Sequence, residues 1–175
     1  MGGIVWLASY PKSGNTWTRH FLHSLIRSRE RSHDINRMKS LTTGDSARAW
    51  YLPFIQKPEG EWTEEIISAA RPQALRNIAA STDGIVFVKT HCAMVRHHGT
   101  PTIEPSVTAA AIYIVRNPLD VAISFAAFMG ADVDAAITAM NRVGACVPTS
   151  ERAVYQYYGS WGEHVESWTR RSAPQ

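Results

Sequence analysis

The sequence predicts an α/β fold of P-loop-like type, with three layers and a short central parallel sheet between helices. Three apolar runs rich in β-forming residues, at 4–10, 84–89 and 109–115, lie among segments of helical period. This pattern is typical of parallel strands that are buried on both faces. A chain of 175 residues, 45% of them hydrophobic, buries enough surface for one core without disulfides or metals. We therefore expect one domain over residues 1–175.

The segments between and after these runs place apolar residues at helical spacing. Pro118 and Asp132 stand where a helix accepts a proline in its first turn and an N-cap, and Pro72 separates two helical segments. Residues 30–60 are polar and lack a clear period, so we expect a long irregular excursion there. The predicted helices span residues 16–29, 62–70, 73–80, 118–129, 133–142 and 151–171.

The composition indicates in which cellular compartment the protein lies and which class of partner it binds. Cys92 and Cys146 have no CxxC partner, the chain starts without a secretory leader, and no apolar stretch approaches the roughly 20 residues of a membrane helix. We expect a cytoplasmic protein without a membrane partner. The net charge of +3 is modest, and it favours small anionic ligands over nucleic acid.

A glycine-containing turn joins the first predicted strand to the first helix, with the sequence SYPKSGNTW at 9–17. The free N–H groups of a helix N-terminus converge in such a turn, and they bind phosphate well. Gly14 lets the backbone approach a ligand, Lys12 adds positive charge, and Ser13 and Thr16 offer hydroxyl donors. The pattern GxxxxGK[ST] of a P-loop is absent. Taken alone, the turn fits an anion site and an ordinary strand-to-helix connection equally.

Two further motifs end the other predicted strands. KTH occupies 89–91, and VRNPLDVAIS follows the third strand at 115–124. Asp120 lies in the first turn of a predicted helix, where a carboxylate stabilises the N-terminus. Because the carboxyl ends of parallel strands meet at one edge of a sheet, we expect the three motifs to share a site.

Together these motifs resemble the signatures of the cytosolic sulfotransferase family. YPKSGNTW is similar to the family's YPKSGTTW, with Asn15 in place of the usual Thr, and the second and third motifs resemble its KTH and VRNPxDVxxS segments. The stretch 158–168 resembles the family's YGSWxxHVxxW, which we interpret as helix packing. The resemblance covers about residues 4–171, nearly the whole chain.

The resemblance implies transfer of a sulfuryl group from 3′-phosphoadenosine 5′-phosphosulfate to a hydroxyl or amine of a small-molecule acceptor. His91 would be the general base, because an imidazole with a pKa near 6.5 suits that task at neutral pH, with Lys12 and Lys89 as supporting charges. Trp17 would stack on adenine, although packing within the fold is an alternative for this side chain. The donor-binding residues would be Lys12, Ser13, Gly14, Asn15, Thr16, Trp17, Arg116 and Ser124.

The chain departs from the family in its length. Family members usually continue with another strand, more helices and a basic Arg-Lys-Gly segment that completes the 3′-phosphate pocket, and we expect the fold to be truncated by comparison. Three functions therefore stay open: a sulfotransferase, a non-catalytic or partner-completed nucleotide-binding module, and, last, a P-loop-type kinase. An uncovered sheet edge predicts a homodimer.

The acceptor pocket is less well defined by the sequence. Trp50, Tyr51, Phe54 and His97 fit an aromatic pocket and an ordinary core equally well. We expect no metal, because the histidine pairs at 20 and 23 and at 97 and 98 lack carboxylate or cysteine partners at ligand spacing.

Overall fold

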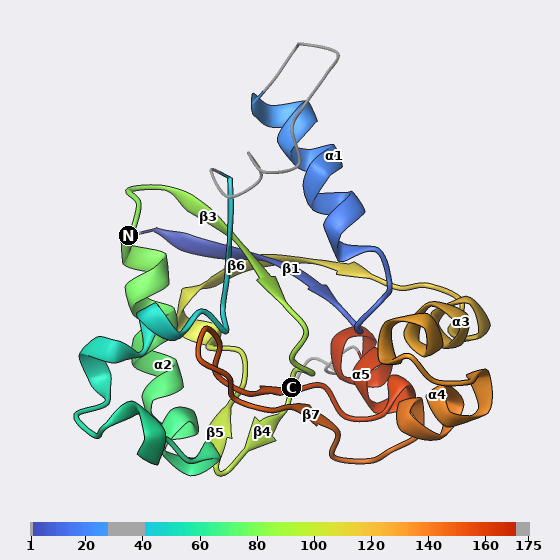
Figure 1. The fold of residues 1–175 in the computed structure, drawn as a ribbon. Coiled ribbons are helices and arrows are strands. Elements are labelled where there is room, and N and C mark those ends of the chain that lie inside the picture. Colours follow the sequence, from blue (N-terminus) through green and yellow to red (C-terminus); the bar gives the residue numbers. More distant parts are fainter. Residues whose placement is uncertain (1, 28–40, 171–175) are drawn as a thin grey trace.

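The computed structural model describes residues 2–27 and 41–170. Its centre is a parallel sheet with the strand order β2-β3-β1-β6 (Figure 1). This confirms the predicted α/β class, and each of the three predicted strands is shifted by one residue. The fourth, β2, was missed because three residues are too short to show a period. The strands are β1 (Gly3–Ser9), β2 (Thr42–Gly44), β3 (Ile85–Thr90) and β6 (Thr108–Ile114).

One face of the sheet is covered by two helices, α2 and α5. Trp6 of β1 pairs with Val88 of β3, and both are fully buried in a cluster with residues of α2. Tyr113 of β6 stacks on Trp168 of α5, with ring centroids 5.9 Å apart. The described α-helices are α1 (Asn15–Arg27), α2 (Glu64–Ala80), α3 (Pro118–Met129), α4 (Val133–Met140) and α5 (Trp161–Thr169).

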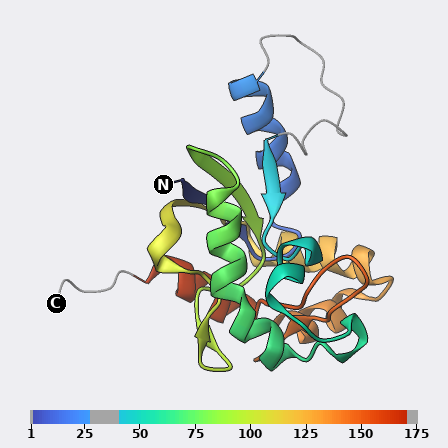
Figure 2. The same cartoon turned by 90° about the vertical axis from the view of Figure 1, so that its left-hand side faces the viewer.

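The opposite face of the sheet carries α1. Arg19 of this helix donates from Nε to Thr42 Oγ1 over 2.9 Å, and Thr42 pairs with Phe87, which points away from α2. Both ribbon views show α1 projecting away from the sheet, whereas α2 lies alongside it (Figures 1 and 2). The predicted end of this helix at 28–29 and the first part of the excursion, 30–40, lie outside the described residues.

Helix α2 continues through Pro72, so the predicted break there is wrong. Thr63 caps its N-terminus by accepting from Ile66 N, and the helix runs for 17 residues to Ala80. A proline inside a helix costs about 3 kcal/mol, but apolar residues on both sides of Pro72 are buried: Ile67 in the cluster that contains Tyr51, and Leu75 against the sheet. Tertiary packing therefore outweighs the local preference for a break.

The end of the chain is less helical than the sequence predicts. Residues 151–160 form no helix, and α5 starts only at Trp161 because Ser160 and Glu163 make a reciprocal capping box. Short antiparallel pairs complete the described fold. They are β4 (Arg96–His97) with β5 (Thr100–Pro101) and β7 (Cys146–Val147) with β8 (Gln156–Tyr157), and the single-turn 3-10 helices are Arg48–Trp50, Leu52–Phe54, Glu59–Glu61 and Pro105–Val107.

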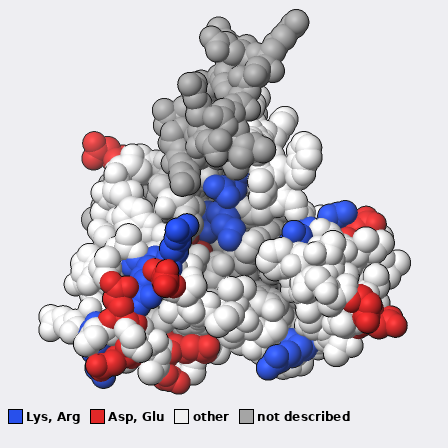
Figure 3. All heavy atoms as spheres, in the orientation of Figure 1, with Lys and Arg blue, Asp and Glu red and all other residues white. Residues whose placement is uncertain are grey.

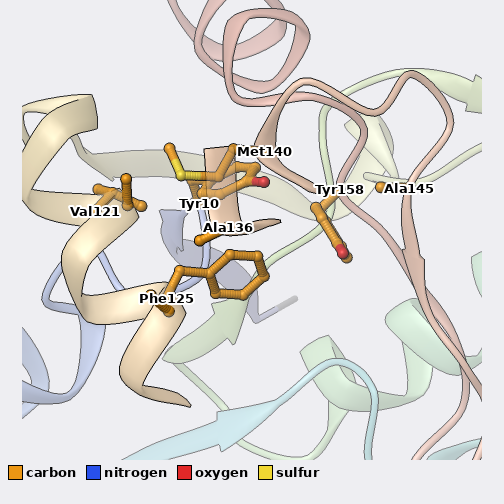
Figure 4. Packing of buried hydrophobic residues seen from close by; sticks show 9 residues of the cluster. Tyr10, Val121, Phe125, Ala136, Met140, Ala145 and Tyr158 are labelled. Atoms are coloured by element: carbon orange, nitrogen blue, oxygen red, sulfur yellow. The ribbon is translucent and has the colours of Figure 1, made fainter. Parts of the chain in front are cut away.

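Helices α3 and α4 form a separate layer beside the carboxyl end of β1. Helix α3 has its predicted bounds, and Asp132 caps α4 as predicted by accepting from Ala135 N. Tyr10, at the end of β1, packs edge-on against Phe125 and Tyr158 in the cluster of Figure 4. No single helix among the described residues is long and apolar enough to cross a membrane; α3 and α4 reach that length only as a pair bent by 110°.

Candidate active site

The carboxyl ends of three strands bring the three sequence motifs to one edge of the sheet. Ala8 pairs with Thr90 and Ser9 with Ile114, so the turn, the KTH segment and the third motif start side by side. A cavity of about 1260 Å³ opens there. In Figure 3, Lys and Arg atoms lie in the hollow in the middle of the face shown.

The cavity brings together most of the predicted site residues. Its other walls come from α3, α4 and the segment 142–148. The predicted residues that line it are Lys12, Gly14, Asn15, Thr16, Trp17, His91, His97, Arg116 and Ser124.

The turn after β1 has a left-handed backbone conformation at two residues. Lys12 has a φ of 66° and Gly14 a φ of 101°. A Cβ at Gly14 would meet nothing within 4 Å, so glycine is needed there for the conformation and not for space. A lysine with positive φ is uncommon and marks a strained site. The N-terminus of α1 follows at once, and its free N–H groups favour an anion.

The side chains of Ser13 and Asn15 in this turn are buried. Asn15 donates from Nδ2 to the Leu7 carbonyl over 2.8 Å and to Ser9 Oγ over 3.2 Å. These bonds tie the start of α1 to the end of β1. Among the described residues, Asn15 Oδ1 and Ser13 Oγ have no hydrogen-bond partner although both are buried. An oxygen in that state has unused bonding capacity beside the cavity.

Positive charge approaches the turn from two sides. The Lys12 ammonium lies 4.6 Å from the centre of the Phe128 ring, a cation–π contact. Arg116 donates from Nη1 to the Lys12 carbonyl over 3.3 Å. The first and third motifs therefore touch each other, and their two cations flank one end of the cavity.

The third motif delivers Arg116 and Ser124 as its spacing predicts. Asn117 caps α3 by accepting from Leu119 N over 2.9 Å, and Pro118 occupies the first turn. Ser124 follows about two turns later on the wall of the cavity. Arg116 is exposed, so its guanidinium is free to form a bidentate contact with a phosphate.

Trp17 does not pack within the fold. Its side chain is 83% exposed at the rim of the cavity, and Phe21, the next apolar residue of α1 on that stripe, is 65% exposed. The packing alternative for Trp17 is therefore wrong in the described structure, and its ring is available to a planar ligand.

The hydrogen bonds of His91 fix which ring nitrogen carries the proton. Nδ1 lies 2.7 Å from the Ser9 carbonyl oxygen, which only accepts, so Nδ1 donates and Nε2 keeps its lone pair. Burial, and next the charge of Lys89, lower the pKa of His91 to about 3. The imidazole is therefore neutral at pH 7 with a lone pair at Nε2, and it is a weaker base than the ordinary imidazole with a pKa near 6.5 that the sequence led us to expect.

His164, on α5, holds the backbone of His91 and was missed by sequence reasoning, which interpreted its motif as packing. Nε2 of His164 lies 3.2 Å from the His91 carbonyl oxygen and donates to it, while Nδ1 accepts from the Tyr113 hydroxyl over 3.0 Å. Burial lowers the pKa of His164 to about 4. The signal was the histidine three residues after the YGSW stretch.

Lys89 lies elsewhere than predicted. Val88 faces α2, so Lys89 points to the opposite face of the sheet, and it is not among the described residues that line the cavity. Burial lowers its pKa, the charge of Asp45 opposes this shift, and that of Arg19 adds to it. Lys89 still influences the site electrostatically, because its positive charge lowers the pKa of His91.

A fully buried polar network supports the KTH segment from behind. Asp45 accepts from Thr90 Oγ1 over 2.7 Å and from Gln156 Nε2 over 3.1 Å, and Arg71 lies 3.9 Å from the same carboxylate. Arg71 also donates to the Tyr155 carbonyl over 3.0 Å. A buried charge pair with these additional bonds holds Thr90, and with it the neighbouring His91, in place.

The aromatic residues proposed for an acceptor pocket divide between core and cavity. Tyr51 is fully buried, and Trp50 packs against the core while its Nε1 donates to Thr43 Oγ1 over 3.2 Å. Phe54 is absent from the described lining, whereas His97 belongs to it. Burial and the neighbouring His98 lower the pKa of His97. The core interpretation holds for Trp50 and Tyr51.

A comparison with protein families agrees with this geometry. The family model described as the sulfotransferase domain matches residues 3–175, and this range includes all three motifs and His164. The match covers nearly the whole chain, and the chain belongs to the sulfotransferase domain family.

Proposed function

We propose that this chain transfers a sulfuryl group from 3′-phosphoadenosine 5′-phosphosulfate to the hydroxyl or amine of a small-molecule acceptor. The observation that carries this proposal is the neutral His91, whose Nδ1 proton is committed to the Ser9 carbonyl and whose Nε2 has no hydrogen-bond partner among the residues that the structure describes. It lines the same cavity as the phosphate-binding turn. A general base and an anion site within one cavity are what in-line transfer to an acceptor requires.

In the proposed reaction His91 takes the acceptor proton while the acceptor oxygen or nitrogen attacks sulfur. The new bond forms to sulfur, the bond from sulfur to the bridging phosphate oxygen breaks, and 3′-phosphoadenosine 5′-phosphate leaves with the electron pair. Lys12 and the N–H groups of the turn stabilise the charge on the leaving phosphate. Lys89 acts through His91, whose pKa its charge lowers.

Donor binding follows from the two cations at the end of the cavity. We assign the 5′-phosphosulfate to the turn with Lys12, Ser13, Gly14, Asn15 and Thr16, and the 3′-phosphate to Arg116 and Ser124. The hydrogen bond from Arg116 to the Lys12 carbonyl supports this assignment, because it joins a residue of one proposed subsite to a residue of the other. The exposed ring of Trp17 supports stacking on adenine.

The decisive experiment is His91→Ala. We expect it to abolish transfer to a panel of phenols, alcohols and amines with labelled donor, while 3′-phosphoadenosine 5′-phosphate still raises the melting temperature. His20→Gln, a histidine of α1 outside the described lining, is the matched control and should keep transfer. Unchanged transfer by His91→Ala would remove His91 from the mechanism, and stabilisation by ATP with Mg²⁺ alone would favour a P-loop-type kinase.

A second candidate is a nucleotide-binding module that another chain completes. The open side of the cavity favours it: Arg116, Leu119 and Ile123 are exposed beside the subsite proposed for the 3′-phosphate. Nucleotide binding without transfer to any acceptor of the panel would support this candidate over the first.

The outer strand β6 supports a homodimer as the partner proposal. It is an end strand of the sheet, and Ala109, Ala110, Ala111 and Ile112 are exposed on it. Unpaired edge strands tend to pair with another chain. Sedimentation measures the oligomeric state, and a comparison of the wild type with Ala110→Pro, which weakens edge pairing, tests the proposal.

We also propose a cytoplasmic location, because Cys92 and Cys146 are free thiols, as a reducing compartment favours.

A further inference from the structure

A cluster of two histidines and a glutamate lies at the wall of the cavity, away from His91. His97 and His98 belong to the hairpin of β4 and β5, and Glu64 to the first turn of α2. The hairpin lies beside α2 in both views (Figures 1 and 2). One potential ligand atom of each of the three residues lies within 4.8 Å of the other two. Glu64 is the carboxylate partner that the sequence alone does not bring to these histidines.

The spacing of the cluster is close to that of a metal site. Ligand atoms about 2.0 Å from a tetrahedral ion are about 3.3 Å from one another. His98 Nε2 lies 3.5 Å from Glu64 Oε2, so the distance between these two ligand atoms is already close to the value for a bound ion. The remaining two distances between ligand atoms are within 4.8 Å, so binding of an ion would have to shorten them.

The backbone of the hairpin turns the two histidines toward each other. His98 has a φ of 47° and Gly99 a φ of 74°, the conformation of a two-residue type I′ turn, in which Asn-Gly is preferred. Consecutive residues of a strand normally point to opposite faces. Here the rings of His97 and His98 have centroids 4.2 Å apart. Histidine at this position is less favourable for the turn than asparagine, and it supplies an imidazole.

The hydrogen bonds of His97 leave one nitrogen free for an ion. Ser68 Oγ uses its hydrogen to donate to the His97 carbonyl oxygen. In its contact with the Tyr155 hydroxyl, Ser68 Oγ is therefore the acceptor and the Tyr155 hydroxyl is the donor. His97 Nδ1, 3.1 Å from the Tyr155 oxygen, must then be the donor of that bond. Its Nε2 carries the lone pair. Metal-bound histidines are oriented by such outer hydrogen bonds.

His98 has an outer partner of the same kind. Its Nδ1 lies 3.5 Å from Glu65 Oε1, while its Nε2 faces Glu64. A carboxylate behind a ligating imidazole fixes the ring and raises its basicity. The two adjacent glutamates at the start of α2 thus divide into one ligand and one outer partner.

We propose that Glu64, His97 and His98 bind a divalent transition-metal ion of the zinc class, with an open coordination position toward the cavity. Two imidazoles and one carboxylate form a donor set that zinc accepts, and three protein ligands leave a position for water or a ligand. Glu64 and His97 line the cavity, so an anionic group of a molecule in the cavity could occupy that position. This inference does not depend on sulfuryl transfer.

The test is titration of the chelator-treated full chain with Zn²⁺ by calorimetry, and with Co²⁺ by visible absorption. We expect one ion per chain and the absorption bands of four- or five-coordinate Co²⁺. His98→Asn and Glu64→Gln should each weaken binding at least about tenfold, and Glu65→Gln should weaken it less. His98→Asn is chosen because asparagine suits the turn, so loss of the ion cannot be ascribed to loss of the hairpin.

Glu61→Gln is the matched control, because this exposed glutamate lies three residues before Glu64 and outside the cluster. It should bind the ion like the wild type. The proposal is overturned if the wild type shows no saturable binding, or if His98→Asn and Glu64→Gln bind as tightly as Glu61→Gln. Equal binding would place the ion on other histidines of the chain.

Discussion

The two faces of the sheet differ in how completely they are covered. On the face toward α2, Trp6 and Val88 are fully buried. On the face toward α1, Ile85 is 60% and Ile112 is 40% exposed, and α1 itself leaves most of its apolar stripe exposed. The face toward α1 is therefore the less completely covered one among the described residues.

The same difference in coverage distinguishes the two parts of the candidate site, the proposed base and the proposed nucleotide contacts. His91 takes its position from the covered face, through Thr90 and the buried Asp45, and through His164 of α5. The proposed nucleotide contacts, Arg116 and Trp17, belong to exposed segments. His91, the proposed base, is therefore held by contacts within the fold, whereas the proposed nucleotide subsite is open on one side. The following predictions test this division.

The largest effect is expected where a buried charge loses its partner. Arg71→Met breaks the ion pair of the fully buried Asp45 carboxylate, and should lower the free energy of unfolding by about 3–5 kcal/mol. Arg116→Met, on the exposed side, should change it by less than about 0.5 kcal/mol. Urea denaturation measures both.

A double variant separates lost charge pairing from lost packing at this position. Asp45→Asn combined with Arg71→Met removes both charges, so it should recover part of the stability lost in Arg71→Met. Equal destabilisation by Arg71→Met and Arg116→Met would show that the two sides do not differ as described.

Acid should destabilise the covered side through His164. The pKa of His164 is lowered to about 4 by burial, so between pH 6.5 and 4 the unfolded chain binds a proton that the folded chain does not. Stability is then complete above pH 6.5 and falls by about 3 kcal/mol as the pH approaches 4. His91, with its pKa lowered to about 3, acts in the same direction.

His164→Gln keeps an amide donor for the His91 carbonyl and removes the titrating group. The slope of unfolding free energy against pH between 4 and 6.5 should become smaller by up to about 1.4 kcal/mol per pH unit. An unchanged slope would mean that His164 does not titrate with folding.

Local signals in the sequence predicted some elements fully and others not at all. Helix α3 has its predicted bounds because Asn117, Pro118 and the left-handed Gly130 mark both ends within a few residues. The continuity of α2 through Pro72 depends on packing against the sheet, and β2 on pairing with β3. Such long-range contacts leave no local pattern.

The same distinction applies to the site. The motif residues at strand ends could be placed, because parallel strands end at one edge. Lys89 was assigned to the cavity by its motif, but the alternation of β3 turns it to the other face. His164 and Asp45 lie far from His91 in sequence, and only the fold shows that they hold it.

A smaller effect is expected at Trp17. Because its side chain is 83% exposed, Trp17→Ala should change the free energy of unfolding by less than about 0.5 kcal/mol. Loss of stacking should weaken binding of 3′-phosphoadenosine 5′-phosphate about fivefold or more, at about 1–3 kcal/mol per stacked base. Calorimetric titration measures the affinity. Unchanged affinity would leave the exposed ring without a part in nucleotide binding.

The smallest change is expected for substitutions of Asn15, the residue whose side chain joins α1 to β1 of the sheet. Its Nδ2 bonds to the Leu7 carbonyl and to Ser9 Oγ attach α1 to β1, and threonine has no second donor to replace both. Asn15→Thr should therefore cost about 1 kcal/mol of unfolding free energy, measured by urea denaturation. Asn15→Ser, which also lacks the amide, should cost about the same. A threonine variant as stable as the wild type would show that the buried amide contributes nothing to the junction.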